Sequence, residues 1–312
     1  MTDQLTPALS PEALWGKSKK YIARALAAKG RNEMGEYQLW ASLALELLGK
    51  ASLATIHPCL IADPQSYVSM FAAAGRNVGT DIKTIIAKTV FERLTHISAR
   101  FDKKTQEFCT NLSLRRNAEL HSGEAPFEGA DASSWEGRFW HTAEIILQSM
   151  NETIESWLGA DQSVAPKELK DEYVHAISEA AKIRVETAGE AFKELPKKER
   201  EAAHALAGRM SMWDARKSFK FSGATIWEDK CPACDSRAFI AGYPLYEEES
   251  DEFDPETGEE TVNITLAAEE FDCPSCRLHL TSRDEIEAVH LDIEHTVSET
   301  RQREYEEDYG ND

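Results

Sequence analysis

Residues 112–127 read LSLRRNAELHSGEAPF and place two arginines, an asparagine and a histidine within seven positions, at Arg115, Arg116, Asn117 and His121. An arginine guanidinium is a permanent planar cation that suits a phosphate group, and an imidazole can accept or donate a proton near neutral pH. Together these groups could cleave RNA without a metal ion. The alternative is a polar surface turn that closes a helix and carries no chemistry.

The spacing of Arg116 and His121 restricts how the two side chains can meet. Five residues of an ideal helix turn through about 500°, which leaves the two side chains about 140° apart. Gly123 follows, and a glycine can take the left-handed conformation that ends a helix. We therefore expect His121 to lie at the end of the helix, where it is free to turn towards Arg116.

A second polar pair, Glu46 and Lys50, interrupts a helix that is otherwise apolar on most sides, roughly residues 34–56. Residues four apart share one helix face, with the glutamate on the favourable N-terminal side. On a surface such a pair is worth a few tenths of a kcal/mol, about 0.3–0.5. The surrounding leucines leave little room for a wet stripe, so we expect the pair to face a cleft or an interface.

These two patterns together resemble the HEPN superfamily. RNAELH looks like its signature of an arginine, a polar residue, a short spacer and a histidine at the end of a late helix, and ELLGK carries the glutamate and lysine of an earlier helix. The resemblance covers roughly residues 10–160. Arg115 also falls within the spacing of the family, but Arg116 is the better match because Asn117 follows it.

The resemblance implies a helical bundle that pairs with a second copy and acts as a metal-independent endoribonuclease. His121 would be the general acid or base, Arg116 would hold the scissile phosphate, Asn117 would orient either group, and Glu46 and Lys50 would support the cleft. It also implies a bacterial defence or toxin effector, with an inhibitory or activating protein partner. The competing hypothesis is a non-catalytic HEPN-like scaffold that recruits a protein through a zinc ribbon.

A metal site is indicated by CPAC at 231–234 and CPSC at 273–276. Two pairs of cysteines, with two residues between the members of each pair, offer four thiolates to a tetrahedral ion, and redox thiols or disulfides are the alternatives. The expected ligands of a structural Zn²⁺ are Cys231, Cys234, Cys273 and Cys276. Four thiolates leave no open position for catalysis and make His279 unnecessary, and we expect Cys59 and Cys109 to be buried core thiols.

The elements that must position these residues are mainly helical. Helices are expected from Ser10 to Gly30, over 34–56, from Asp63-Pro64, over 80–94, from Ser98 into the motif, and over 135–158, and no strand signal precedes residue 224. The expected organisation is a HEPN-like helical domain at 10–160, a helical connector at 166–220, a four-cysteine zinc ribbon at 224–282 and an acidic helical tail at 283–312. Within the connector, helices are expected to start at Pro166 and Pro196. The ribbon is expected to consist of two strands joined by an acidic loop.

The net charge of −20 is unevenly distributed. Residues 1–140 carry 17 Lys and Arg against 15 Asp and Glu, whereas residues 222–312 carry 6 against 26. The charge of the first half is therefore compatible with RNA binding, and the expected contact surface for RNA is formed by Lys17, Lys19, Lys20, Arg24 and Arg115. The acidic tail would serve solubility or compete with RNA for that surface.

The expected location is the cytoplasm. No run of about 18 apolar residues suggests a membrane-spanning helix, and the first residues, MTDQLTPALSPEALW, lack the regions of a secretory signal. We therefore expect no membrane partner and read the six cysteines as thiols or metal ligands in a reducing compartment.

Overall fold

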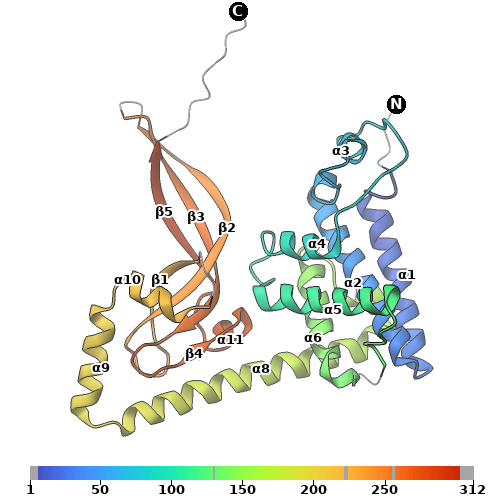
Figure 1. Cartoon of the computed structure of the whole chain (residues 1–312). Helices are drawn as coiled ribbons and strands as arrows, with labels where there is room; N and C mark the ends of the chain where they lie inside the picture. Colours follow the sequence, from blue (N-terminus) through green and yellow to red (C-terminus); the bar gives the residue numbers. More distant parts are fainter. Residues whose placement is uncertain (1–5, 129–130, 221–223, 255–256, 303–312) are drawn as a thin grey trace, which may run out of the picture. The chain divides into compact units, whose positions relative to one another are not determined.

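The computed structural model of the chain describes residues 6–128, 131–220, 224–254 and 257–302, with the backbone alone at 251–254. It divides into two compact units, Met1–Glu179 and Ala180–Asp312 (Figure 1). The first unit is helical, and the second is built on an antiparallel sheet that carries the four cysteines. The expected fold class, a mainly helical chain with a β region at its C-terminal end, is confirmed.

The first unit, within the described residues, is a bundle of seven helices, two short 3-10 turns and the start of a long eighth helix. Its helices are α1 (Pro11–Gly30), α2 (Met34–Ile56), α3 (Tyr67–Ala73), α4 (Ala87–Leu94), α5 (Lys103–His121), α6 (Glu136–Gln148), α7 (Ile154–Leu158) and α8 (Ala160–Glu194), with 3-10 turns at Pro58–Leu60 and Ala132–Ser134. As expected, the Ser10 hydroxyl accepts from the Ala13 N–H and Pro11 opens α1.

The apolar helix α2 forms the centre of the bundle and contacts α1, α4, α5 and α6. It is long and apolar enough to cross a membrane by length and composition, yet 61% of its apolar window is buried inside the protein. A core helix passes the same test, so burial explains this composition. Gly49 brings α4 close, because a Cβ at this position would lie 2.9 Å from Val90 Cγ1.

Five expected helix boundaries in this unit were wrong. α3 begins at Tyr67, after the Ser66 cap, and not at Asp63-Pro64, and α5 begins at Lys103, after the Asp102 cap, and not at Ser98. The segment before Ala87 is extended, because Ile85 N–H donates to the Ile61 carbonyl in a small β-like contact. The helix expected over 135–158 breaks after Gln148, where Asn151 takes a positive φ of 57° and Thr153 caps α7. α8 begins after Gly159, with a φ of 88°, so Pro166 lies inside the helix and does not start it.

The second unit contains the end of α8, then α9 (Lys197–Arg209), α10 (Met212–Ala215), a 3-10 turn (Arg216–Ser218), β1 (Thr225–Lys230), β2 (Arg237–Asp254), β3 (Glu259–Asp272), β4 (His279–Leu280), α11 (Arg283–Ala288) and β5 (Glu294–Gln302). The strand order is β1-β2-β3-β4, and β5 also pairs with β3 (Figure 1). All pairs are antiparallel. The expected pair of strands with an acidic connection corresponds to β2 and β3.

The prediction of a helical tail over 283–312 was wrong. Ser282 caps a helix as expected, but α11 ends at Ala288, and β5 then pairs with β3 from Glu294 to Gln302. Two apolar residues an even number of positions apart, Ile293 and Val297, pack on the core of the sheet and favour a strand. Residues 303–312 of the expected tail lie outside the described residues.

Gly242 provides a test of the β2–β3 pairing. A Cβ at this position would overlap the Ala267 carbonyl oxygen and lie 2.8 Å from the Trp227 ring. We predict that Gly242→Ala destabilises the second unit by about 3 kcal/mol or more, because the strands would have to separate. Urea unfolding followed by tryptophan fluorescence measures this loss. Gly208→Ala in α9, where a Cβ meets nothing within 4 Å, is the control, and an unchanged midpoint for Gly242→Ala would contradict the pairing.

Candidate functional site

The first unit contains a cavity of ≈ 620 Å³ on the side where α2 and α5 meet. Side chains of α2, α4, α5 and the segment before α4 line it, and they include charged, polar and apolar groups. The lining residues are Glu46, Lys50, Thr84, Ile85, Ile86, Ala87, Lys88, Thr110, Ser113, Leu114, Arg116 and Asn117. Four of the five expected catalytic residues therefore lie in one cavity.

A network of charges holds one wall of this cavity. Glu46 accepts from Lys50 Nζ at 2.8 Å through Oε1 and from Arg116 through Oε2. Lys50 also donates to Thr84 Oγ1 at 3.1 Å, and Arg116 donates through Nε and Nη2 to Asn117 Oδ1, at 3.2 and 2.9 Å. The side chains of Glu46, Lys50 and Arg116 are only 14%, 11% and 10% exposed. The expectation that Glu46 and Lys50 face a cleft thus agrees with their position.

The ionisation of Glu46 follows from these partners. Burial raises the pKa of this carboxyl, but the charge and hydrogen bond of Lys50, followed by those of Arg116, outweigh burial, so its pKa lies below the usual value. The carboxylate is therefore ionised at neutral pH. With Lys50, Lys88 and Arg116 against one carboxylate, the lining of the cavity is net positive.

His121 is the last residue of α5 and is exposed. The helix is regular up to this residue, so His121 lies about 140° around the axis from Arg116 and only about 40° from Asn117. It does not line the cavity but follows Asn117 by one turn on the same face. Asn117 Oδ1 accepts two hydrogen bonds from Arg116. The Asn117 amide therefore lies between the Arg116 guanidinium and the helix face that carries His121.

Arg115 occupies a different place from Arg116. Its Nη2 donates to the Pro126 carbonyl at 2.6 Å, and its guanidinium lies over the Phe127 ring, 5.3 Å from the centroid. It therefore holds the segment that follows α5 and does not line the cavity. Of the two arginines of the motif, the structure places Arg116 at the cavity.

The basic residues of α1 lie mostly against aromatic rings. Lys17 and Arg24 lie over Tyr21, Arg24 also lies over Trp40, and Lys19 lies over Trp15 and donates to the Ser156 carbonyl at 2.8 Å. Lys20 is exposed. These contacts give the cations a structural role in the bundle, and α1 contributes no residue to the cavity.

Sequence reasoning missed four polar lining residues: Thr84, Lys88, Thr110 and Ser113. Thr110 precedes Asn117 by seven positions and Ser113 precedes Arg116 by three, so helical periodicity could have placed them on the same side of α5. Thr84 and Lys88 carry no comparable signal, because their place depends on the contact between the segment before α4 and Ile61.

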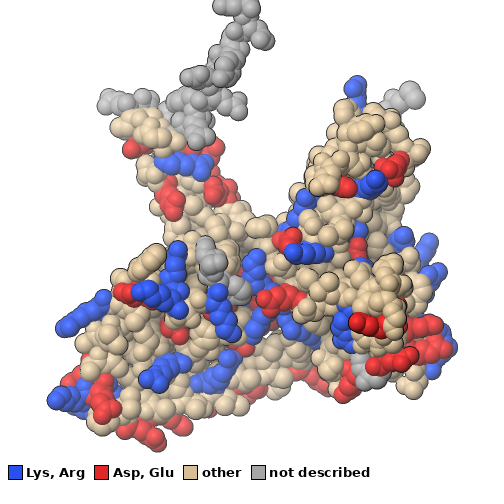
Figure 2. All heavy atoms as spheres, viewed as in Figure 1, with Lys and Arg blue, Asp and Glu red and all other residues tan. Residues whose placement is uncertain are grey.

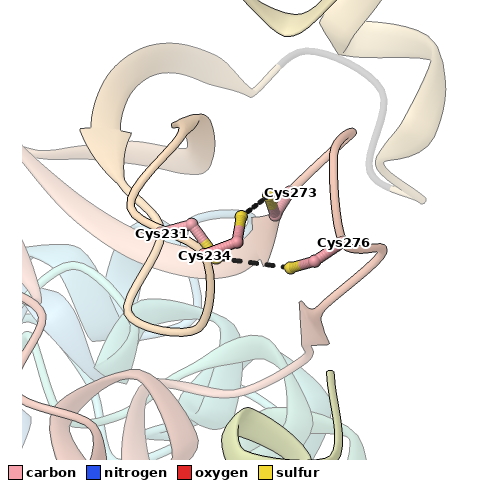
Figure 3. Close-up of side chains that lie close together, drawn as sticks. All are labelled: Cys231, Cys234, Cys273 and Cys276. Atoms are coloured by element: carbon pink, nitrogen blue, oxygen red, sulfur yellow. Dashed lines mark hydrogen bonds between the residues drawn. The ribbon is translucent and has the colours of Figure 1, made fainter. Parts of the chain in front are cut away.

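The second candidate site is the cluster of Cys231, Cys234, Cys273 and Cys276, whose sulfurs all lie within 4.8 Å of one another. The Sγ atoms of Cys231 and Cys276 are 3.5 Å apart, and those of Cys234 and Cys273 are 3.6 Å apart (Figure 3). Sulfurs bound tetrahedrally at about 2.3 Å from a zinc ion would be separated by about 3.8 Å. The four expected ligands therefore come together in a cluster that fits a structural metal.

The turns at 231–234 and 273–276 follow different strands but have the same pattern of backbone hydrogen bonds. Through their carbonyls, Cys231 accepts from Asp235 N–H at 2.9 Å, and Cys273 accepts from Arg277 N–H at 2.8 Å. Asp235 and Arg277 both have a positive φ, 58° and 61°. Each turn therefore presents its two sulfurs to the same cluster.

The four thiols affect one another's ionisation, which explains why a bound cation would stabilise their thiolate forms. Hydrogen bonds from Cys231 and its neighbours lower the pKa of Cys234, whereas hydrogen bonding to Cys234 raises the pKa of Cys231. Ionising one thiol thus disfavours ionising the next. A divalent cation removes this opposition, because it stabilises all four thiolates at once.

The remaining cysteines and His279 take no part in this cluster. Cys109 is buried, as expected, and burial raises the pKa of its thiol. Cys59 is only partly buried, because it lies in the short 3-10 turn after α2, so the expectation of a buried core thiol was wrong for this residue. His279 Nδ1 lies 3.4 Å from Asp272 Oδ1 and points to the acidic side of β3.

Comparison of the chain with protein families, with curated proteins and with solved structures found no match.

Glu46 gives a pH-dependent test of the charge network. Because its pKa in the folded protein lies below the value of about 4.3 of an unfolded chain, its ionised form stabilises the fold fully above that value, and the contribution is lost as the pH falls through the folded pKa. We predict that Glu46→Gln lowers the free energy of unfolding by about 3 kcal/mol at pH 7, because two buried cations lose their partner. The difference from the wild type should shrink below about pH 4.

Urea unfolding near neutral pH and again in acid, about one pH unit below the unfolded pKa, measures both effects. Glu107→Gln, on the exposed side of α5, is the matched control and should follow the wild type under both conditions. A Glu46→Gln protein as stable as the control at neutral pH would show that the network adds nothing.

Proposed function

We propose that the chain is a metal-independent endoribonuclease of HEPN type. The observation that supports this most is the position of Arg116, whose guanidinium is fixed by Glu46 and Asn117 at the wall of a net positive cavity. Three of its five N–H groups donate to these two residues, which leaves two for a phosphate. A guanidinium held in this way is already oriented before a ligand arrives.

In the proposed reaction His121 acts as a general base. It takes the proton of a ribose 2′-hydroxyl, the 2′-oxygen forms a bond to phosphorus, and the bond from phosphorus to the 5′-oxygen breaks. A second imidazole protonates that leaving oxygen, and the products are a 2′,3′-cyclic phosphate and a 5′-hydroxyl. Arg116 offsets the charge that develops on the phosphate, and Asn117 orients the phosphate or the imidazole.

The second imidazole is proposed to come from another copy of the chain. Ile86 and Leu114 line the cavity and are 68% and 59% exposed. Leu120, beside His121, is also exposed. Large apolar side chains at the rim of a polar cavity favour a protein contact, and a two-fold contact here would bring two copies of the motif together. RNA and a second copy are thus the proposed partners, in the cytoplasm, and a bacterial defence or toxin role is the proposed context.

A second candidate function, a HEPN-like scaffold without activity, is favoured by the same exposed Ile86 and Leu114 and by the position of His121 outside the cavity. In that case the apolar rim would bind a different protein. Cleavage of RNA distinguishes the two functions, because a scaffold would leave RNA intact.

We propose that the cysteine cluster binds structural Zn²⁺. Four thiolates suit this ion, and two matching turns present the sulfurs at distances that fit its tetrahedral geometry. The four ligands fill the coordination sphere, so the metal would hold the two turns together and take no part in cleavage.

The catalytic proposal predicts metal-independent cleavage. Purified protein incubated with total RNA and a chelator should give products that end in a 2′,3′-cyclic phosphate. His121→Ala and Arg116→Ala should each lower the rate by roughly 100-fold or more, because each removes a group that acts in the transition state. His96→Ala, an exposed histidine just after α4, is the control. Intact RNA with the wild type, or equal cleavage by His121→Ala, would reject the proposal.

The metal proposal predicts one Zn²⁺ per chain. Cys273→Ser should release the ion and unfold the sheet around Trp227, because the small core there also contains the cysteines. Elemental analysis and tryptophan fluorescence measure the two effects. Cys59→Ser, outside the cluster, should keep the zinc, and native protein without zinc would disprove the assignment.

A further inference from the structure

The second unit contains a cavity of ≈ 550 Å³ that shares no residue with the cavity at Arg116 and borders the proposed zinc site at Cys234. It lies between the hairpin formed by α8 and α9 and the first cysteine turn, and its lining residues are Phe192, Lys193, Lys197, Arg200, Glu201, His204, Pro232, Ala233, Cys234 and Asp235. Its volume falls within the range of small-molecule sites, about 300–1,000 Å³.

The walls of this cavity are fixed by close packing. A Cβ on Gly189 would lie 3.0 Å from the Ala233 carbonyl oxygen, so α8 lies directly against the cysteine turn. Ser275 Oγ donates to the Ala203 carbonyl at 3.3 Å, and Arg237 donates to the carbonyls of Ala207 and Met210 at 3.2 and 2.8 Å. α9 is therefore anchored at its middle and at its end, and the cavity does not depend on a ligand for its shape.

The charge of this region is opposite to that of the sheet. Residues 193–220 contain eight Lys and Arg against four Asp and Glu, whereas residues 222–312 contain 6 against 26. Figure 2 shows Lys and Arg side chains gathered over α9 and α10, with acidic side chains interspersed. Three of these cations, Lys193, Lys197 and Arg200, line the cavity. The acidic sheet disfavours a polyanion that lies along it, whereas a single phosphate group could still reach these cations.

Arg200 adds a permanent cation to the lining of this cavity. Its Nε is buried, so only the other atoms of this side chain can face a ligand in the cavity. Lys197 approaches Glu201 only at 3.8 Å with 83% of its side chain exposed, so it too is available to an anion.

The opposite wall is apolar. Phe192 is buried, and His204 meets its ring edge to face, with centroids 5.2 Å apart. Pro232 and Ala233 complete this wall. A phosphate alone would contact only the cations, whereas a ligand that joins a phosphate to a flat apolar group would fill both sides.

We propose that this cavity binds a phosphate-bearing ligand with an apolar ring, of which a nucleotide is the simplest example. The phosphate would accept from Arg200 and from Lys193 and Lys197, and the ring would lie against Phe192 and Pro232. The inference is independent of the proposed nuclease activity, because it concerns a different unit and different residues. The ligand chemistry can come from a free nucleotide or from the phosphorylated end of a nucleic acid.

Calorimetric titration of the full-length, metal-loaded protein tests this site. The probes are AMP, adenosine, inorganic pyrophosphate and a deoxytrinucleotide with and without a 5′-phosphate, which cannot be cleaved because it lacks 2′-hydroxyls. We expect AMP to bind roughly tenfold or more tightly than adenosine and more tightly than pyrophosphate, since only AMP meets both walls. Preference for the 5′-phosphorylated trinucleotide over AMP would assign the ligand to a nucleic-acid end, and the reverse would assign it to free nucleotides.

Arg200→Gln should weaken AMP binding by roughly tenfold or more, since a charge-assisted hydrogen bond is lost. Lys198→Gln is the matched control, because it removes an exposed cation of the same helix that does not line the cavity. Zinc content and the melting temperature show whether Arg200→Gln is folded. Lys193→Gln, an exposed side chain, provides a second variant that should also weaken binding. No binding of AMP at millimolar concentration, or equal binding by Lys193→Gln, Lys198→Gln and the wild type, would overturn the proposal.

Discussion

A largely buried carboxylate on an apolar helix needs cationic partners, and Glu46 on α2 is such a carboxylate. Lys50, one turn later, satisfies one oxygen, and Arg116 from α5 satisfies the other. An unpaired charge at this depth would destabilise the bundle by several kcal/mol, roughly 3–5. The pairing therefore fixes α5 against α2 and at the same time turns Arg116 towards the cavity, so one interaction serves both the fold and the candidate site.

The second unit is held together differently. Its core around Trp227 is small and includes Cys231 and Cys273 among its buried residues. A core of this size benefits from an added restraint, and the proposed metal, held by four thiolates, would provide one. Arg283 adds another, since its guanidinium is buried against Glu269 at 2.6 Å and attaches α11 to β3.

Local signals predicted much of the chain. Helix α1 begins after Ser10, at Pro11, and ends at Gly30, as expected. The spacing of the cysteines identified the four residues that cluster. The placement of Glu46 and Arg116 in one cavity needs a contact between residues 70 apart, which spacing alone cannot give. Only the family resemblance brought these residues together beforehand, and it did not reveal that Asn117 lies between Arg116 and the face of His121.

The wrong predictions also have physical causes that the local sequence does not determine. β5 was read as helix because it is highly charged and Ser282 does begin a helix, while its strand character comes from pairing with β3, a strand that lies well before it in the sequence. The break at Asn151 depends on a positive φ that asparagine tolerates but does not require. The cavity beside Arg200 could not be foreseen, because it exists only where α8 and α9 meet the cysteine turn.

The hairpin of β2 and β3 has a consequence for how the chain folds. Its strands pair as far as Asp254 and Glu259, and their register shifts three times before the cysteine turns at the other end. A slip of one residue would exchange the two faces and move the turns by about 3.4 Å, which would separate sulfurs that now lie 3.5 and 3.6 Å apart. The four sulfurs meet in the native register alone, so the formation of the cluster selects the correctly paired hairpin from its misaligned competitors.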